Sequence, residues 1–277
     1  MKDKNILLNL NEIAIKVRKD ILTMISNAGS GHPGSSLSAV ELLVSLYFKH
    51  LKVNIENPHN QDRDYFILSK GHACPLLYSI LARKGFFDVR ELYTLRKLGS
   101  RLQGHPSKDK NLPGIEISTG SLGYGLSIGV GIAAGLKCKT MNTLKVYVMM
   151  GDGEHQEGSV WEAAMAASHY NLSNLCAIID NNKLQIDGKT RHIMNVESLM
   201  DKYRSFGWMV LEVDGHNFKE IDKAYLTFKE ESKKPVCIIA NTVKGKGISF
   251  MEHQVTWHGK TISNADLIKA LKELENK

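Results

Sequence analysis

Two turns at a fixed separation constrain this chain of 277 residues more than any other feature. Gly151–Gly153 reads Gly-Asp-Gly and follows one apolar run, and Asn181–Asn182 follows a second apolar run after 27 intervening residues. A stretch of helical composition lies between the two turns, so the order is strand, turn, helix, strand, which is one βαβ unit. We therefore expect Asp152 and Asn182 each just beyond the carboxyl end of a strand.

That edge of an open parallel sheet is where ligands bind. Neighbouring strands are about 4.8 Å apart, so the side chains of Asp152 and Asn182 can reach one ion between them. Carboxylate, amide and carbonyl oxygens suit Mg²⁺ whose coordination is completed by water and by phosphate groups. Turns of either kind are common alone. The ordered pair predicts a site for a metal ion with a phosphorylated ligand.

The sequence around both turns resembles the thiamine-diphosphate enzymes. The segments 151–158 and 180–188 are similar to the transketolase branch, more than to the pyruvate dehydrogenase or pyruvate decarboxylase branches. The resemblance implies that Asp152 and Asn182 bind Mg²⁺ by their side chains and Leu184 by its carbonyl, with Ca²⁺ or Mn²⁺ as alternatives.

The same resemblance implies further contacts to thiamine diphosphate. Asn182 would contact the cofactor as well as the metal. Gly153 would donate its backbone N–H to the diphosphate, which agrees with the affinity of a helix start for anions.

Composition excludes several other classes of protein. The net charge of +7 comes from scattered Lys and Arg, without a basic stripe, so we expect a solvated basic surface, no nucleic-acid partner and sugar phosphates as natural ligands. The four cysteines are far apart in the sequence, which favours a reducing compartment without structural zinc. Neither a signal peptide nor a membrane-spanning apolar run is recognisable. We expect a cytoplasmic protein.

The chain reads as one continuous α/β pattern without linkers or repeats. Helical spacing appears at 10–27 and 39–47, with a loop at 28–36, and a short charged helix begins at Asn264. The strand candidates are 65–69, 145–150, 175–179, 209–213 and 236–240. Helices separate most of them, so the prediction is a single domain, 1–277, with an open, mainly parallel sheet of five to six strands and helices on both faces.

The glycine-rich segment 120–135 has two parts. Gly129-x-Gly131-x-x-Ala134 matches a dinucleotide fingerprint, but it precedes a strand, which is the wrong context. We expect the glycines of 125–135 to let a helix lie close against the sheet. The preceding segment, 119–125, resembles the transketolase loop that contacts the cofactor, and there Gly120, Ser121 and Leu122 would be the contacting residues.

Four of the 11 histidines stand in glycine-rich or otherwise tight turns: His32, His72, His105 and His258. A lone loop histidine is more often a surface residue than a catalyst. The remaining seven are expected to be ordinary structural or surface residues, with His216 in a helix-capping turn beside Asn217. They are His50, His59, His155, His169, His192, His216 and His253.

Transketolases carry histidines in similar surroundings. The resemblance implies that His32 and His105 contact sugar hydroxyls, that His72 meets the diphosphate, and that His258 touches cofactor and substrate and moves protons. A pKa near 6.5 suits histidine to such work. The segment 244–247, Lys-Gly-Lys-Gly, is open to two interpretations, a mobile lid or a solvated basic turn.

The resemblance covers less than half of a full transketolase. In that family a glutamate from a separate pyrimidine-binding domain activates the cofactor, and the resemblance identifies no such glutamate in this sequence. We therefore expect a partner, a C-terminal transketolase subunit, in an (αβ)₂ heterotetramer. The resemblance places Glu157 and Glu162 near that interface, with Glu157 also contacting the cofactor. These two glutamates begin a predicted helix. The part of it around Trp161, Ala163, Ala164 and Ala167 offers small, closely packable positions for the interface.

The predicted activity is a transferase reaction of the pentose phosphate pathway type. It moves a two-carbon ketol unit reversibly from a ketose phosphate to an aldose phosphate, with thiamine diphosphate and Mg²⁺. One alternative is a non-catalytic thiamine-diphosphate-binding protein. A second is a subunit like deoxyxylulose-phosphate synthase, although the turns at 30–34 and 104–106 look more like transketolase.

Overall fold

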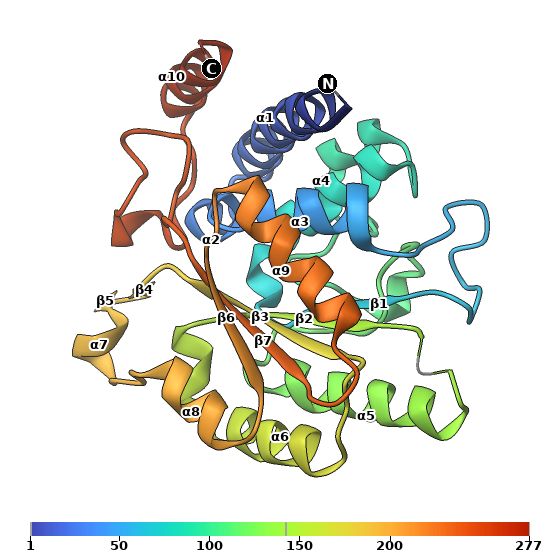
Figure 1. Cartoon of the computed structure of the whole chain (residues 1–277). Coiled ribbons are helices and arrows are strands. Elements are labelled where there is room, and N and C mark those ends of the chain that lie inside the picture. Colours follow the sequence, from blue (N-terminus) through green and yellow to red (C-terminus); the bar gives the residue numbers. More distant parts are fainter. Residues whose placement is uncertain (1, 142, 277) are drawn as a thin grey trace.

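A computed structural model describes residues 2–141 and 143–276, and it has the predicted α/β architecture (Figure 1). The five strands of its main sheet are all parallel and lie in the order β1-β2-β3-β7-β6. They are β1 (Tyr65–Leu68), β2 (Val146–Gly151), β3 (Leu175–Asn181), β6 (Met209–Asp214) and β7 (Val236–Asn241). All five strand predictions are confirmed.

Helices cover both faces of the sheet, as Figure 1 shows. On one face lie α1 (Lys2–Ala28), α3 (Val40–Ser45), α4 (Cys74–Lys84) and α9 (Phe218–Glu230), and on the other α5 (Tyr124–Cys138), α6 (Gly158–His169) and α8 (Leu199–Ser205). The inner strands β2, β3 and β7 are mainly apolar because alternate side chains enter two cores. In β2, Tyr147 and Met149 pack in the first core, and Val148 and Met150 in the second.

Shorter elements frame the carboxyl edge of the sheet. They are α2 (Pro33–Leu37), the two-stranded hairpin of β4 (Leu184–Gln185) and β5 (Gly188–Lys189), α7 (Thr190–Ile193), and single turns at Gly71–Ala73, Gly153–Gln156 and Val255–Trp257. Further turns lie at Leu46–His50, Val89–Thr94 and Lys108–Lys110, and α10 (Asn264–Glu275) packs against α1. Because Pro33 starts α2, the predicted loop 28–36 is shorter than expected.

The glycines of α5 fulfil the expectation only in part. A methyl group at Gly125 would overlap Ser69, and one at Gly129 would overlap Val148 Cγ2, so these two do face inward. At Gly131 and Gly135 nothing lies within 4 Å of such a methyl group, so the prediction of close packing is wrong there. The helix turns about 100° per residue, which carries these two positions away from the sheet.

Three of the four interface positions predicted on α6 are also wrong, whereas Trp161 stays a prediction. Ala163, Ala164 and Ala167 are at most 4% exposed, because they pack against the sheet of their own chain. Trp161 donates its indole N–H to the His155 carbonyl at 2.9 Å. A large apolar side chain that does stand free on this helix is Met165, which is 55% exposed.

No helix in the described ranges, 2–141 and 143–276, is long and apolar enough to cross a membrane.

Gly129→Ala should lower the free energy of unfolding by about 1–3 kcal/mol, because the added methyl group overpacks the contact with Val148. Gly135→Ala is the matched control on the same helix. It should raise the free energy of unfolding by about 0.5–1 kcal/mol, since alanine is the better helix former. Urea denaturation followed by circular dichroism measures both, and equal effects of the two variants would contradict the packing described.

Candidate active site

Asp152 and Asn182 directly follow the neighbouring strands β2 and β3, as predicted. Asp152 is 4% exposed, and its carboxylate accepts a hydrogen bond from Thr190 Oγ1 at 2.9 Å. Burial raises the pKa of Asp152 to about 6. Among the described residues no side chain forms an ion pair with it, so this carboxylate is a buried acceptor without a cation.

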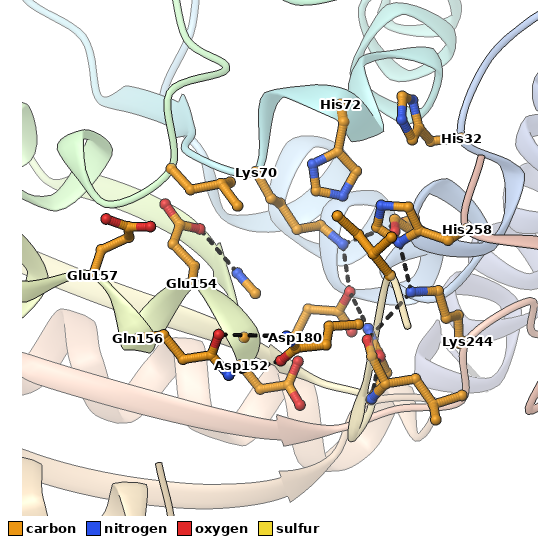
Figure 2. A pocket seen from close by; sticks show the side chains of 18 of the residues that line it. His32, Lys70, His72, Asp152, Glu154, Gln156, Glu157, Asp180, Lys244 and His258 are labelled. Atoms are coloured by element: carbon orange, nitrogen blue, oxygen red, sulfur yellow. Dashed lines mark hydrogen bonds and ion pairs between the residues drawn. The ribbon is translucent and has the colours of Figure 1, made fainter. Parts of the chain in front are cut away.

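A cavity of about 340 Å³ opens beside these two residues (Figure 2). Ten of the predicted site residues line it: His32, His72, Gly120, Leu122, Asp152, Gly153, Glu157, Asn182, Leu184 and His258. Two do not. Ser121 and His105 are both exposed, and a methyl group on Gly120 would come within 2.9 Å of the His105 ring.

The four turn histidines come from distant parts of the chain; three of them line this cavity, and His105 lies near His32. The ring centre of His32 is 5.2 Å from that of His72, 5.4 Å from that of His258 and 6.4 Å from that of His105. The rings of His72 and His258 are 5.3 Å apart. The structure brings these four turns close together, and their roles stay predictions.

All four imidazoles are held in the neutral form. Burial, reinforced by Arg96, lowers the pKa of His32 to about 4, and burial with Lys244 lowers that of His258 to about 3. Burial likewise lowers the pKa of His72 and of His105. Each neutral ring therefore has one N–H that can donate a hydrogen bond and one nitrogen that can accept one.

Lys70 and Asp180 form a buried ion pair that the sequence did not single out (Figure 2). Lys70 also donates to the Ser35 carbonyl at 2.8 Å, and Asp180 accepts from Ser38 Oγ at 2.5 Å. Both residues line the cavity. Asp180 stands inside the Asp-Asn-Asn motif, but its sequence position does not distinguish it from an ordinary turn aspartate.

The interpretation of the segment 244–247 as a solvated basic turn is wrong for its first residue, whereas the mobile lid stays a prediction. Lys244 is 1% exposed, and its ammonium lies 2.9 Å from His258 Nδ1 and 3.2 Å from the Leu184 carbonyl. Burial, together with the charge of Lys70, lowers the pKa of Lys244 to about 8. This residue belongs to the wall of the cavity, where a basic turn pattern gave no reason to place it.

Glu154 joins the two glycine-rich motifs. Its carboxylate accepts the Gly123 N–H at 2.8 Å and the Gly151 N–H at 3.1 Å, as well as the Ser69 hydroxyl. The side chain is 2% exposed, and burial raises its pKa. This bridge fixes the loop before α5 against the turn after β2, so Gly120 and Gly153 face the same cavity.

The residues present fit a metal ion with a diphosphate. Asp152 supplies a buried carboxylate, and Asn182 and Leu184 supply amide and carbonyl oxygens, which are hard ligands. Gly153 brings a backbone N–H to the cavity, and Lys244 brings a cation. His32 Nδ1 is buried without a hydrogen-bond partner among the described residues, as expected of a group that faces a ligand.

A parallel sheet with this edge site is the architecture of a thiamine-diphosphate-binding domain. The chain matches the family described as "Transketolase, thiamine diphosphate binding domain" over residues 11–275, and it belongs to that family.

Its relatives are transketolases and transketolase subunits. It is 42% identical to one subunit of the apulose-4-phosphate transketolase of Phocaeicola vulgatus, over 95% of this chain and 92% of that protein. It is 43% identical to the 6-deoxy-6-sulfo-D-fructose transketolase subunit SqwG of a Clostridium species, over 97% of each. Human transketolase is 40% identical over 94% of this chain, which spans 41% of the human protein.

The crystal structure of Campylobacter jejuni transketolase has the same fold. It superposes with a TM-score of 0.89 at 35% identity, over 96% of this chain and 42% of that protein.

Asp152→Asn should stabilise the metal-free protein at pH 8 by roughly 1–3 kcal/mol. The folded-state pKa of about 6 lies above the ordinary 3.8, so ionisation costs stability as pH rises through this range, and the amide abolishes that cost. The gain should shrink as pH falls from 8 to 4. Thermal unfolding in a chelating buffer measures it, and a gain independent of pH would contradict the assignment.

Proposed function

We propose that this chain is the cofactor-binding subunit of a two-subunit transketolase. The reaction is transfer of a two-carbon ketol unit from a ketose phosphate to an aldose phosphate, with thiamine diphosphate and Mg²⁺. The observation that carries the proposal is the meeting of His32, His72 and His258 with Asp152 and Asn182 around one cavity. A protein that only bound the cofactor would have no chemical need for these histidines.

The metal and the diphosphate would be held at the sheet edge. Asp152, Asn182 and the Leu184 carbonyl would bind Mg²⁺, while the Gly153 N–H and His72 would contact the diphosphate. When bound, thiamine diphosphate supplies the carbanion chemistry that breaks and forms carbon–carbon bonds. The loop at 120–122 would hold the rest of the cofactor.

The proton transfers would fall to the histidines. The rings of His258 and His32 lie edge to face with their centres 5.4 Å apart, and both line the cavity, so they would take a proton from a sugar hydroxyl and return it. His105 packs behind Gly120 and would reach the sugar from the cavity rim.

The partner would carry the pyrimidine-binding domain and its activating glutamate, in an (αβ)₂ assembly in the cytoplasm. Two relatives named as transketolase subunits match this chain over 92% and 97% of their own length, which supports a divided enzyme. The partner-facing surface would include the outer sides of α5 and α6, where Tyr124 is 58% and Met165 is 55% exposed, and the exposed Glu157 and Glu162.

Reconstitution tests the divided enzyme. Purified alone, the chain should transfer no two-carbon unit from xylulose 5-phosphate to ribose 5-phosphate, and mixed with a C-terminal transketolase subunit it should. Light scattering of the complex should give two copies of each chain. Fructose 6-phosphate, apulose 4-phosphate and 6-deoxy-6-sulfofructose extend the donor panel. Strong activity of the isolated chain would contradict the proposal.

His258→Ala tests the proton-transfer role in the assembled enzyme. Turnover should fall by about 10²–10⁴-fold, the usual contribution of a general acid–base group, while cofactor affinity by calorimetry changes far less. His59→Ala, at an exposed loop histidine, is the control and should keep full turnover. If His258→Ala keeps wild-type turnover, the histidine is an ordinary loop residue.

A further inference from the structure

Outside the cavity, an ion pair and a hydrogen bond join three largely enclosed side chains. Glu41 on α3 pairs with Arg18 on α1 at 2.7 Å and with His216 Nδ1, after β6, at 3.0 Å. Burial would raise the pKa of Glu41, but Arg18 and His216 outweigh it and lower the pKa to about 2. None of the three lines the cavity, and nothing in the proposed function uses them.

Both side-chain partners of Glu41 also bind the backbone of one loop, 243–251. Arg18 Nε donates to the Lys246 carbonyl at 2.9 Å. His216 Nε2 accepts the Val243 N–H at 2.9 Å. The loop is therefore held immediately before and shortly after Lys244.

The hydrogen bonds fix the tautomer of His216. Since Nε2 accepts from a backbone N–H, the ring proton must be on Nδ1, where it is donated to Glu41. The imidazole thus links the buried Glu41 carboxylate to the backbone of the loop through one hydrogen bond on each side of the ring. It does more than share the capping turn expected from the sequence, since Asn217 alone caps α9 by accepting from Lys219 N.

Two glycines allow the loop backbone to approach Arg18 closely. Gly245 and Gly247 have φ of +79° and +98°, and a methyl group on Gly247 would come within 2.7 Å of Arg18 Nε. Gly245 N–H donates to the Gly34 carbonyl at 3.1 Å, so the loop is also tied to the turn that carries His32.

We infer that Glu41, Arg18 and His216 are positioning residues for Lys244 and, through it, for His258. The ammonium of Lys244 lies 2.9 Å from His258 Nδ1, and the ring of His258 also packs near that of His72 (Figure 2). A displaced loop would withdraw Lys244 from both His258 and the Leu184 carbonyl. The structural part of this inference stands on the contacts alone, whereas its catalytic consequence rests on the proposed function.

Hydrogen exchange of the full chain tests the structural part. His216→Phe keeps the ring but loses both hydrogen bonds, and Glu41→Gln is a milder variant that loses the charge. In both, amides of 243–251 should exchange roughly tenfold faster or more, while the strands keep their protection. His50→Phe is the matched control, because His50 is also buried and bonds to the Asp222 carboxylate at 2.8 Å instead of to the loop. Unchanged exchange in 243–251, or equal exchange in the His50→Phe control, overturns the inference.

Kinetics of the reconstituted enzyme test the catalytic part. Glu41→Gln and His216→Phe should lower kcat at least tenfold with a smaller change in KM, and His50→Phe should leave both unchanged. In a Lys244→Met background the further loss from Glu41→Gln should vanish, because the carboxylate acts through the lysine. A full additional loss overturns the inference. If the wild-type complex has no transketolase activity, the proposed function fails, and hydrogen exchange alone decides the positioning.

Discussion

The carboxyl edge of the sheet depends on one buried carboxylate. Asp180, near the carboxyl end of β3, is fully buried and accepts hydrogen bonds from Lys70, Ser38, Thr242 and Asn182. A buried ion pair is favourable only when the remaining lone pairs of the carboxylate are also satisfied. Here the partners come from the ends of β1, β3 and β7 and from the segment after α2, so the satisfaction of one charge fixes four segments together.

Asp180 also sets the direction in which Asn182 points. The amide nitrogen of Asn182 donates to Asp180 at 3.3 Å, and its oxygen accepts the Leu184 N–H at 3.1 Å. An amide oxygen has two lone pairs. Because the nitrogen is engaged by Asp180 and the Leu184 N–H uses only one lone pair of the oxygen, the other lone pair is available for a cation. Asp180 thus helps to orient a proposed metal ligand, although its own carboxylate is fully engaged with groups of the protein.

The sequence predicts the sheet and its carboxyl edge, because the apolar runs and the order of strands and helices can be read directly along the chain. The apolar runs mark the strands, and the parallel connection brings Asp152 and Asn182 to adjacent strand ends. The turn histidines were recognisable from resemblance and from glycine-rich surroundings. Lys70, Lys244 and Glu154 were not, because a buried charge and a solvated one look the same in sequence. Only the packing of distant segments shows that they are enclosed.

Small residues were misjudged for a related reason. Gly131 and Gly135 face away from the sheet, whereas Ala163 and Ala167 face it, the reverse of the expectation in both helices. A small side chain permits close approach on any face of a helix, and its identity does not say which neighbour approaches. The choice is made by the larger residues beside it, such as Val148 beneath Gly129.

The charges that remain in the cavity are of opposite sign and are kept apart. The charge of Lys70 is used by Asp180, whereas within the described residues Lys244 has no carboxylate partner and Asp152 has no cation. Direct pairing of Asp152 with Lys244 would stabilise the empty protein, but Thr190 holds the carboxylate and His258 lies beside the ammonium instead. The histidines that line the cavity stay neutral. A ligand that places a cation at Asp152 and an anion near Lys244 therefore gains both interactions without breaking an ion pair of the protein, which is the charge pattern of a magnesium-bound diphosphate.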